Sequence, residues 1–129
     1  MCGICGIYNY GSHDHVGIDC IQAMNDTLRH RGPNDEGRYT DGDLGLAMRR
    51  LSIIDIEGGT QPIHNEDKTI WIVFNAEIFN YQELKRNLEC KGHTFYTQSD
   101  TETIVHLYEQ YGDDCVNFLR GMFAFALWD

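Results

Sequence analysis

Short strand-like runs alternate with helical repeats along this chain. Strands are expected at five places: 5–10, 38–40, 44–49, 51–55 and 69–75. The dipeptide Asp41-Gly42 favours a tight hairpin turn between the second and third of these strands. The last two strands are rich in Ile, Val and aromatic residues, which suits a pleated and partly buried surface. The pattern therefore predicts a mostly antiparallel sheet.

Helical periodicity predicts three helices between and after these strands. The first ends by Gly32-Pro33 and has its apolar positions on one side: Ile18, Ile21, Met24 and Leu28. The other two begin with a capping-box pattern, a polar residue followed three positions later by glutamate: Asn80 with Glu83, and Ser99 with Glu102. Gly92 and Gly112 are expected to end these two helices.

The chain closes with an apolar run at 122–128 that lacks polar alternation. Such a run predicts a strand that is covered on both faces. The outer edge of a buried strand would offer unpaired backbone groups to another strand. We therefore expect the 129 residues to be the N-terminal portion of a longer domain.

Composition narrows the range of functions. The chain has 129 residues, 42% of them hydrophobic, which fits a single folded domain with its own core. A formal net charge of -10 argues against binding to nucleic acid, because phosphates require clustered Lys and Arg. The sequence shows neither a membrane-spanning run nor a signal peptide, so no membrane partner and a cytoplasmic location are expected.

The five cysteines predict reduced thiols rather than disulfides, since their number is odd and no export signal is present. Cys2 and Cys5 have the two-residue gap of a zinc knuckle, and His13 and His15 lie nearby. That combination does not match the ligand spacing of structural zinc sites. No metal ligand is assigned from the sequence.

Cys2 is the strongest candidate for chemistry. Removal of Met1 would leave a thiol and a free α-amine on the same residue. An N-terminal amine can take up the proton of a nucleophile without a separate histidine base. The reference pKa values of the two groups lie within about one unit of each other near neutral pH. Cys2 is therefore a candidate nucleophile.

Three further positions carry polar groups at strand or helix ends. Arg50 follows a strand and can hold a carboxylate in a two-pronged hydrogen bond, or pair with an acidic surface residue. Asn75 and the N–H of Ala76 follow a buried-looking strand and suit an oxyanion hole, or Asn75 caps a turn. Asp100 opens a helix, where the helix dipole favours a carboxylate for structural reasons alone.

Seven motifs, read together, resemble the glutaminase domain of class II glutamine amidotransferases, and most closely that of glutamine-hydrolysing asparagine synthetases. They run in the order found in that family: 1–7, 29–33, 50–55, 61–62, 75–80, 99–102 and 120–127. The resemblance covers the whole chain. It implies an α+β fold of the N-terminal nucleophile hydrolase type, with four αββα layers in which two stacked antiparallel sheets lie between helices.

By this resemblance, Cys2 attacks the side-chain amide of L-glutamine, releases ammonia and leaves a glutamyl thioester that water hydrolyses. Asn75 and the N–H of Ala76 then hold the oxyanion. Arg50 binds the substrate α-carboxylate and Asp100 its α-ammonium. The remaining pocket residues implied by the family are Leu51, Ser52, Ile53, Ile54 and Glu77. Arg31 and Gly32 would lie on a loop that closes over the substrate.

Three residues depart from the family pattern: Ala76 stands for Gly, Phe79 for Tyr and Met48 for His. Ala76 matters most, because a side chain there would be strained if the position required positive φ. On that premise, Ala76→Gly is expected to raise glutamine turnover. Phe79 loses a hydroxyl hydrogen bond, and Met48 has no assigned consequence.

The resemblance also implies partners and cofactors. A C-terminal synthetase domain would use ATP and Mg²⁺ to activate aspartate, whereas the glutaminase domain itself needs no cofactor. The Ser-Gly-Gly-x-Asp-Ser loop of such a synthetase domain does not occur in these residues. Two alternatives stay open, a sugar-modifying amidotransferase and an inactive module that serves assembly. A homodimer is a further open expectation.

Overall fold

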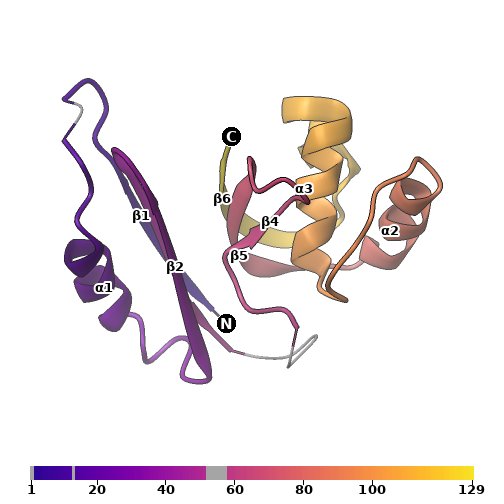
Figure 1. The fold of residues 1–129 in the computed structure, drawn as a ribbon. Helices are drawn as coiled ribbons and strands as arrows, with labels where there is room; N and C mark the ends of the chain where they lie inside the picture. Colours follow the sequence, from indigo (N-terminus) through magenta and orange to yellow (C-terminus); the bar gives the residue numbers. More distant parts are fainter. Residues whose placement is uncertain (1, 13, 52–57) are drawn as a thin grey trace.

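The computed structural model describes residues 2–12, 14–51 and 58–129, and these form two three-stranded antiparallel sheets stacked between helices. In order, the first sheet contains β1 (Gly3–Tyr8), β3 (Leu44–Arg50) and β2 (Asp35–Asp41), and the second β4 (Ile63–His64), β5 (Trp71–Ile78) and β6 (Gly121–Trp128). The helices are α1 (Ile18–Asp26), α2 (Tyr81–Glu89), α3 (Asp100–Tyr111) and the 3-10 helix η1 (Gly112–Phe118). Figure 1 shows α1 outside the first sheet, and α2 and α3 outside the second. The predicted αββα layering is confirmed.

The first sheet forms around the predicted hairpin. β2 and β3 pair from Asp41 opposite Leu44, and Gly42 takes the positive φ that the turn requires. β1 pairs with the other edge of β3. Helix α1 covers the outer face, where Ile21 packs against Ala47, and a Cβ on Gly45 would collide with the Ile21 side chain. The strand expected at 5–10 lies two residues earlier, and the strand expected at 51–55 falls largely outside the described residues.

Side chains alternate between the two faces of β1, β3 and β5, so one set lies between the two sheets and the other lies beneath the helices. On β3, Leu44, Leu46 and Met48 face Val73 of the second sheet. Cys2 and Ile4 pack into this same layer, because residues two apart on a strand share a face. The alternation thus brings Cys2, just before β1, to the space between the two sheets.

The second sheet buries its other face against α2 and α3. That core contains Ile72, Phe74 and Ile78 from β5, and its helix residues are Leu84, Leu88, Ile104, Val105 and Leu107. Even-numbered β5 residues therefore face the helices and odd-numbered ones face the first sheet. No helix in the described parts of the chain combines the length and apolar composition needed to cross a bilayer.

The capping boxes are confirmed only in part. Ser99 does cap α3, since its Oγ accepts a hydrogen bond from the N–H of Thr101 at 3.0 Å. Glu102 instead accepts from the N–H groups of Tyr96 and Thr97, at 2.8 and 2.7 Å. The side chain of Asn80 accepts from the N–H of Arg120 at 3.0 Å rather than from the α2 backbone. The partner of Asn80 lies 40 positions away, whereas the partners of Glu102 lie in the segment just before the helix, upstream of the N-cap residue.

The prediction that both faces of the last strand are covered is wrong. Residues 121–124 of β6 are exposed, and Met122 shows 70% of its surface, while residues 125–128 are half-buried. Within the described residues, β6 pairs with β5 alone and forms an edge of its sheet. An apolar run therefore indicated the strand correctly but not its burial.

Candidate active site

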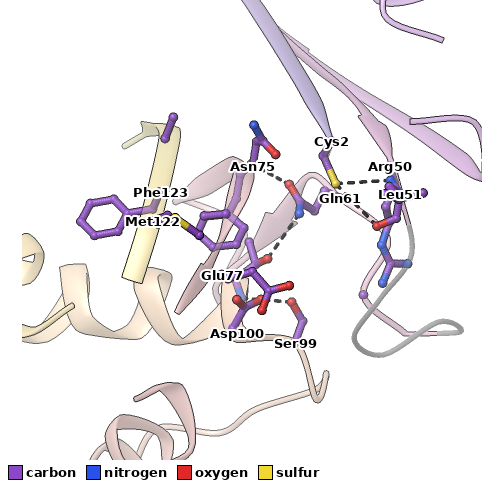
Figure 2. A pocket seen from close by; sticks show the side chains of 15 residues that line it. Cys2, Arg50, Leu51, Gln61, Asn75, Glu77, Ser99, Asp100, Met122 and Phe123 are labelled. Carbon is purple, nitrogen blue, oxygen red and sulfur yellow. Dashed lines mark hydrogen bonds between the residues drawn. The ribbon is translucent and has the colours of Figure 1, made fainter. Parts of the chain in front are cut away.

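Backbone groups fix Cys2 at the entrance to β1. Its sulfur receives a hydrogen bond from the N–H of Leu51, with 3.3 Å between the N and Sγ atoms, and its Sγ lies 3.7 Å from the Leu51 carbonyl oxygen. The Arg31 Nε donates to the Cys2 carbonyl at 3.0 Å. Figure 2 shows the thiol between Gln61 on one side and Leu51 on the other. Residues far apart in the sequence thus hold the thiol in one position.

Close packing of the backbone places Arg50 beside Cys2. Gly32 lies so near β3 that a Cβ at that position would collide with the backbone of Arg49 and Arg50. The N–H of Asn34 donates to the Arg50 carbonyl at 3.1 Å. Arg50 itself is only 4% exposed. In this structure, Arg31 and Gly32 support the backbone of Cys2 and Arg50, and their predicted role in closing over the substrate stays a prediction.

A cavity of about 340 Å³ opens beside the Cys2 thiol. It is lined by all the described residues that the sequence had suggested for the site: Cys2, Arg50, Leu51, Asn75, Ala76, Glu77 and Asp100. Ser52, Ile53 and Ile54 lie outside the described residues. The cavity contains both a buried guanidinium and a buried carboxylate, which suits a small zwitterionic ligand better than an apolar one.

The edge of β5 that faces away from β6 borders this cavity. Two of its N–H groups are bound by side chains: Phe74 donates to Gln61 Oε1 at 2.6 Å, and Ile78 donates to Asp100 Oδ2 at 3.1 Å. Backbone N–H directions alternate along an antiparallel strand, so the N–H of Ala76 points to the same edge, midway between them. β4 pairs with β5 only at Trp71 and Ile72 and leaves this stretch open.

The Asn75 side chain reaches the cavity by a different route. Odd-numbered positions of β5 face the first sheet, where Val73 packs in the same layer as Cys2. Asn75 therefore projects from the face of the strand, whereas the N–H of Ala76 lies in the plane of the sheet. The two donors therefore approach the cavity from perpendicular directions.

Asp100 joins the start of α3 to the edge of β5. It is 6% exposed, and burial raises the pKa of its carboxyl. The hydrogen bond from Ile78 lowers this pKa, and the nearby charge of Glu77 raises it, with a net rise above the ordinary value. A buried carboxylate with a neighbouring negative charge is well suited to receive a cation.

Sequence reasoning missed several residues of the cavity wall. Gln61 was noted only as part of a motif, yet its side chain connects Phe74 of β5 with Thr101 of α3, with 3.3 Å between Nε2 and the Thr101 Oγ1. Met122 and Phe123 of β6 form the apolar part of the wall. A glutamine beside a proline gives no sign of such a role, because its partners lie 13 and 40 positions away.

The premise that Ala76 is strained is wrong. In the described part of the chain, Lys68 is the one non-glycine residue with positive φ, and Ala76 is a regular β5 residue opposite Phe123. Met48 is fully buried between the sheets, where an apolar side chain fits. Phe79 is exposed, so an aromatic ring without a hydroxyl leaves no buried polar group unpaired there.

The Ala76→Gly variant is accordingly expected to give no gain in glutamine turnover. Glycine in a strand adds backbone freedom in the unfolded state and is expected to cost about 0.5 to 1 kcal/mol of stability. Chemical denaturation and steady-state rates of glutamate formation would measure the two effects. A several-fold faster Ala76→Gly protein would show that the methyl group hinders the site.

Comparisons with known proteins identify the family. A family model described as a glutamine amidotransferase domain matches residues 1–129. Asparagine synthetase 1 (glutamine-hydrolysing) of Bacillus subtilis is 46% identical over 131 aligned residues, which cover all of this chain and 21% of that protein. A homologue of the same name from Arabidopsis thaliana is 45% identical, with 100% and 22% covered. The chain thus spans about a fifth of the length of these relatives.

A solved structure supports the fold. Glutamine phosphoribosylpyrophosphate amidotransferase of B. subtilis, complexed with ADP and GMP, superposes with a TM-score of 0.73 over 96% of this chain and 34% of its own. Its 21% sequence identity shows common architecture rather than common substrate. The motifs, the layered fold and the match over the whole length agree: this chain belongs to the glutamine amidotransferase domain family.

Proposed function

We propose that this chain hydrolyses L-glutamine to glutamate and ammonia, with Cys2 as the nucleophile. The observation that carries the proposal is the single cavity in which the Cys2 thiol, the open edge of β5, buried Arg50 and buried Asp100 meet. Family membership and similarity to glutamine-hydrolysing asparagine synthetases support it. The nucleophile, two oxyanion donors and a pair of charges are the parts that such a reaction requires.

Substrate binding uses the opposite charges at the two sides of the cavity. Arg50 would hold the α-carboxylate of glutamine in a bidentate pair, and Asp100 its α-ammonium. Together they select a free amino acid over a glutamine within a peptide, which lacks both charges. Leu51, Glu77 and the side chains of Met122 and Phe123 would enclose the rest of the molecule.

In the first chemical step, the Cys2 α-amine accepts the thiol proton and the sulfur attacks the side-chain amide carbon. The developing oxyanion would lie against the Asn75 amide and the N–H of Ala76, which are fixed before the reaction begins. The α-amine then gives its proton to the departing nitrogen as the C–N bond breaks, and ammonia leaves. The product is a glutamyl thioester on Cys2.

Hydrolysis of the thioester follows the same pattern. The α-amine accepts a proton from water, whose oxygen attacks the carbonyl carbon, and the same two donors hold the second oxyanion. The C–S bond breaks, the Cys2 sulfur takes back a proton and glutamate is released. Both half-reactions need a free α-amine, so the mechanism requires that Met1 be removed.

The fate of the ammonia is a separate proposal. The relatives are asparagine synthetases about five times as long as this chain. We propose that the ammonia passes to a C-terminal synthetase domain that activates aspartate with ATP and Mg²⁺. No cofactor is proposed for the glutaminase reaction itself. A cytoplasmic location and a homodimer stay predictions.

Measurement of glutamate and ammonia release from glutamine tests the proposal directly. Protein with a verified N-terminal Cys2 should release the two products in equal amounts, and should do so without ATP. Failure of the processed protein to release either product would overturn the proposed function. Glutamine blocked at its α-amine or α-carboxylate should be a poor substrate because it lacks one of the two charges. Asparagine should also be poor, because its side chain is one methylene shorter and places the amide carbon farther from Cys2.

The raised pKa of Asp100 predicts a pH dependence of glutamine binding. As pH falls through this raised pKa, Asp100 becomes protonated and loses its attraction for the substrate ammonium. The value of kcat/KM is therefore expected to decline at a higher pH than for an ordinary aspartate, with kcat less affected. Initial rates measured over a pH series, at low and at saturating glutamine, would separate the effect on kcat/KM from the effect on kcat.

Two variants test whether protonation of Asp100 causes this decline of kcat/KM at low pH. In Asp100→Asn, kcat/KM should fall at neutral pH by an amount corresponding to about 2 kcal/mol or more. The acidic decline that is confined to kcat/KM should disappear, whereas a decline caused by protonation of the Cys2 α-amine would appear in kcat as well. In Glu77→Gln, removal of the neighbouring negative charge should move that decline to lower pH. If an acidic decline confined to kcat/KM persisted in Asp100→Asn, the decline would belong to another group.

A further inference from the structure

A second cluster of metal-binding side chains lies along α3, beyond the residues that line the cavity. His106 and Glu109 are three positions apart and share one face of the helix. His93 reaches them from the loop after α2, and Glu66 from the turn between β4 and β5. One nitrogen or oxygen atom from each of His93, His106 and Glu109 lies within 4.8 Å of the others. The cluster therefore joins three segments of the chain.

Both histidines direct the same ring nitrogen at the same carboxylate oxygen. The Nδ1 of His106 lies 2.7 Å from Glu109 Oε2, and the Nδ1 of His93 lies 3.3 Å from it. Glu66 Oε2 is 3.9 Å from the His106 Nδ1. The His106 side chain is 1% exposed and that of His93 is 15% exposed. Two imidazoles and two carboxylates thus converge, with the histidines on the buried side and Glu66, whose side chain is 48% exposed, on the side open to solvent.

The outer nitrogens of both rings face oxygen acceptors. His93 Nε2 is 3.3 Å from Gln110 Oε1, and His106 Nε2 is 3.5 Å from Glu102 Oε1. These oxygens can accept a proton carried on Nε2. In the structure, His106 Nδ1 donates to Glu109 Oε2 and His106 Nε2 makes no hydrogen bond, so an ion would displace the proton from Nδ1 and use the lone pair that this frees. Histidines that bind metals usually donate their other N–H to a carboxylate or another oxygen in this way.

We propose that His93 Nδ1, His106 Nδ1 and Glu109 Oε2 bind a divalent transition-metal ion of the zinc class, with Glu66 as the fourth ligand. Imidazole and carboxylate are suitable zinc ligands, and four protein ligands are typical of structural sites. The two carboxylates balance the charge of the ion. Tetrahedral bonding would place neighbouring ligand atoms about 3.3 Å apart. The distance from His93 Nδ1 to Glu109 Oε2 already fits. His106 would move slightly away from Glu109, and the exposed Glu66 side chain, which lies outside the three-residue cluster, would turn toward the ion.

Hydrogen bonds from outside the cluster support these ligands. Asn65 Nδ2 donates to Glu109 Oε1 at 2.9 Å, which orients Oε2 toward the histidines. The Thr94 N–H donates to Glu66 Oε1 at 3.1 Å and leaves Oε2 on the inner side. Glu102 is held by the N–H groups of Tyr96 and Thr97. The ligands are therefore oriented by the fold before an ion arrives.

The consequence is structural, because no residue of the cluster lines the cavity beside Cys2. An ion would tie α3 to the loop that precedes it and to the β4–β5 turn. α3 begins with Asp100, so the ion would stabilise the helix that presents a residue of the candidate active site. Its binding does not depend on glutamine hydrolysis and can be measured without it.

The test uses the protein with Cys2→Ala, so that the terminal thiol cannot hold the metal. After treatment with chelator and desalting, titration with Zn²⁺ by calorimetry should show one equivalent bound, and the thermal midpoint should rise with Zn²⁺ concentration. Adding His93→Gln should weaken binding at least 100-fold and remove the thermal shift. Gln110→Ala, which removes only the outer acceptor, should weaken it about 10-fold or more.

His30→Gln is the matched control, since His30 is an exposed histidine at the opposite side of the fold, and it should bind like its parent. Co²⁺ in place of Zn²⁺ should show tetrahedral ligand-field bands without thiolate charge transfer. Three results would each overturn the proposal: no stoichiometric binding, unchanged affinity in His93→Gln, or a thiolate band that points to the cysteines. The first would identify the cluster as an ion-pair network only.

Discussion

Cys2→Ala is expected to lower the rate of glutamine hydrolysis by about four to six orders of magnitude, the usual effect of removing a covalent nucleophile. The loss should appear in kcat, because Arg50 and Asp100 remain to bind the substrate. Coupled detection of glutamate, with ammonia measured independently, would check the rate. Isothermal titration with glutamine should still detect binding to the variant.

Cys5→Ala is the matched control for this experiment. Its thiol lies on the other face of the same sheet, against Val16, Ile21 and Ala47 beneath α1. Burial raises the pKa of the Cys5 thiol, which leaves it protonated and unreactive. Turnover should therefore stay near that of the parent. A Cys2→Ala protein that still hydrolysed glutamine, or a Cys5→Ala protein that did not, would contradict the assignment.

Asn75→Ala is expected to reduce kcat about 10²- to 10³-fold with little change in KM, as when one donor of an oxyanion hole is lost. The donor acts on a charge that develops only in the transition state, so ground-state binding should be largely retained. Steady-state kinetics of glutamate formation over a wide range of glutamine concentrations would separate the two parameters.

Asn75→Asp provides a sharper version of the same test. It keeps the shape of the side chain but replaces the N–H donor with an acceptor, so kcat should fall at least as far as in Asn75→Ala. Circular dichroism and thermal unfolding of both variants would show whether the fold is kept. If kcat were unchanged while KM rose, Asn75 would be a substrate-binding residue and not an oxyanion donor.

Local patterns predicted much of the fold. The Asp41-Gly42 hairpin, the helix at Ser99 and the strand at 69–75 each depend on neighbours within a few positions, and the structure has all three. Helix and strand ends shifted by up to a few residues, because tertiary contacts decide where the ends lie. The expected partner of the Asn80 side chain was wrong for the same reason, since Arg120 lies 40 positions away. Glu102 binds N–H groups just upstream of its helix instead of that of the N-cap residue.

The site was predictable in its members but not in its geometry. Motifs at Cys2, Arg50, Asn75 and Asp100 indicated these residues, and the described structure brings them to one cavity. The sequence alone could not show that Gln61 and Asp100 occupy the N–H groups on either side of Ala76. It also gave no sign that His93 and His106 meet, since they come from a loop and a helix that only packing brings together.

In the proposed mechanism, the open edge of β5 makes catalysis depend on whether residue positions along this strand are odd or even. N–H groups and side chains both alternate with a period of two. Inserting one residue within β5 before Asn75 would therefore point the N–H of Asn75, instead of that of Ala76, at the cavity. The same shift would turn the Asn75 side chain into the apolar core between β5 and α3. Insertions of two residues would restore both directions. Evolutionary changes in length are thus tolerable in the loops around this strand, whereas an odd-numbered change within it would remove both proposed oxyanion donors from the cavity and turn Ile78 out of the core.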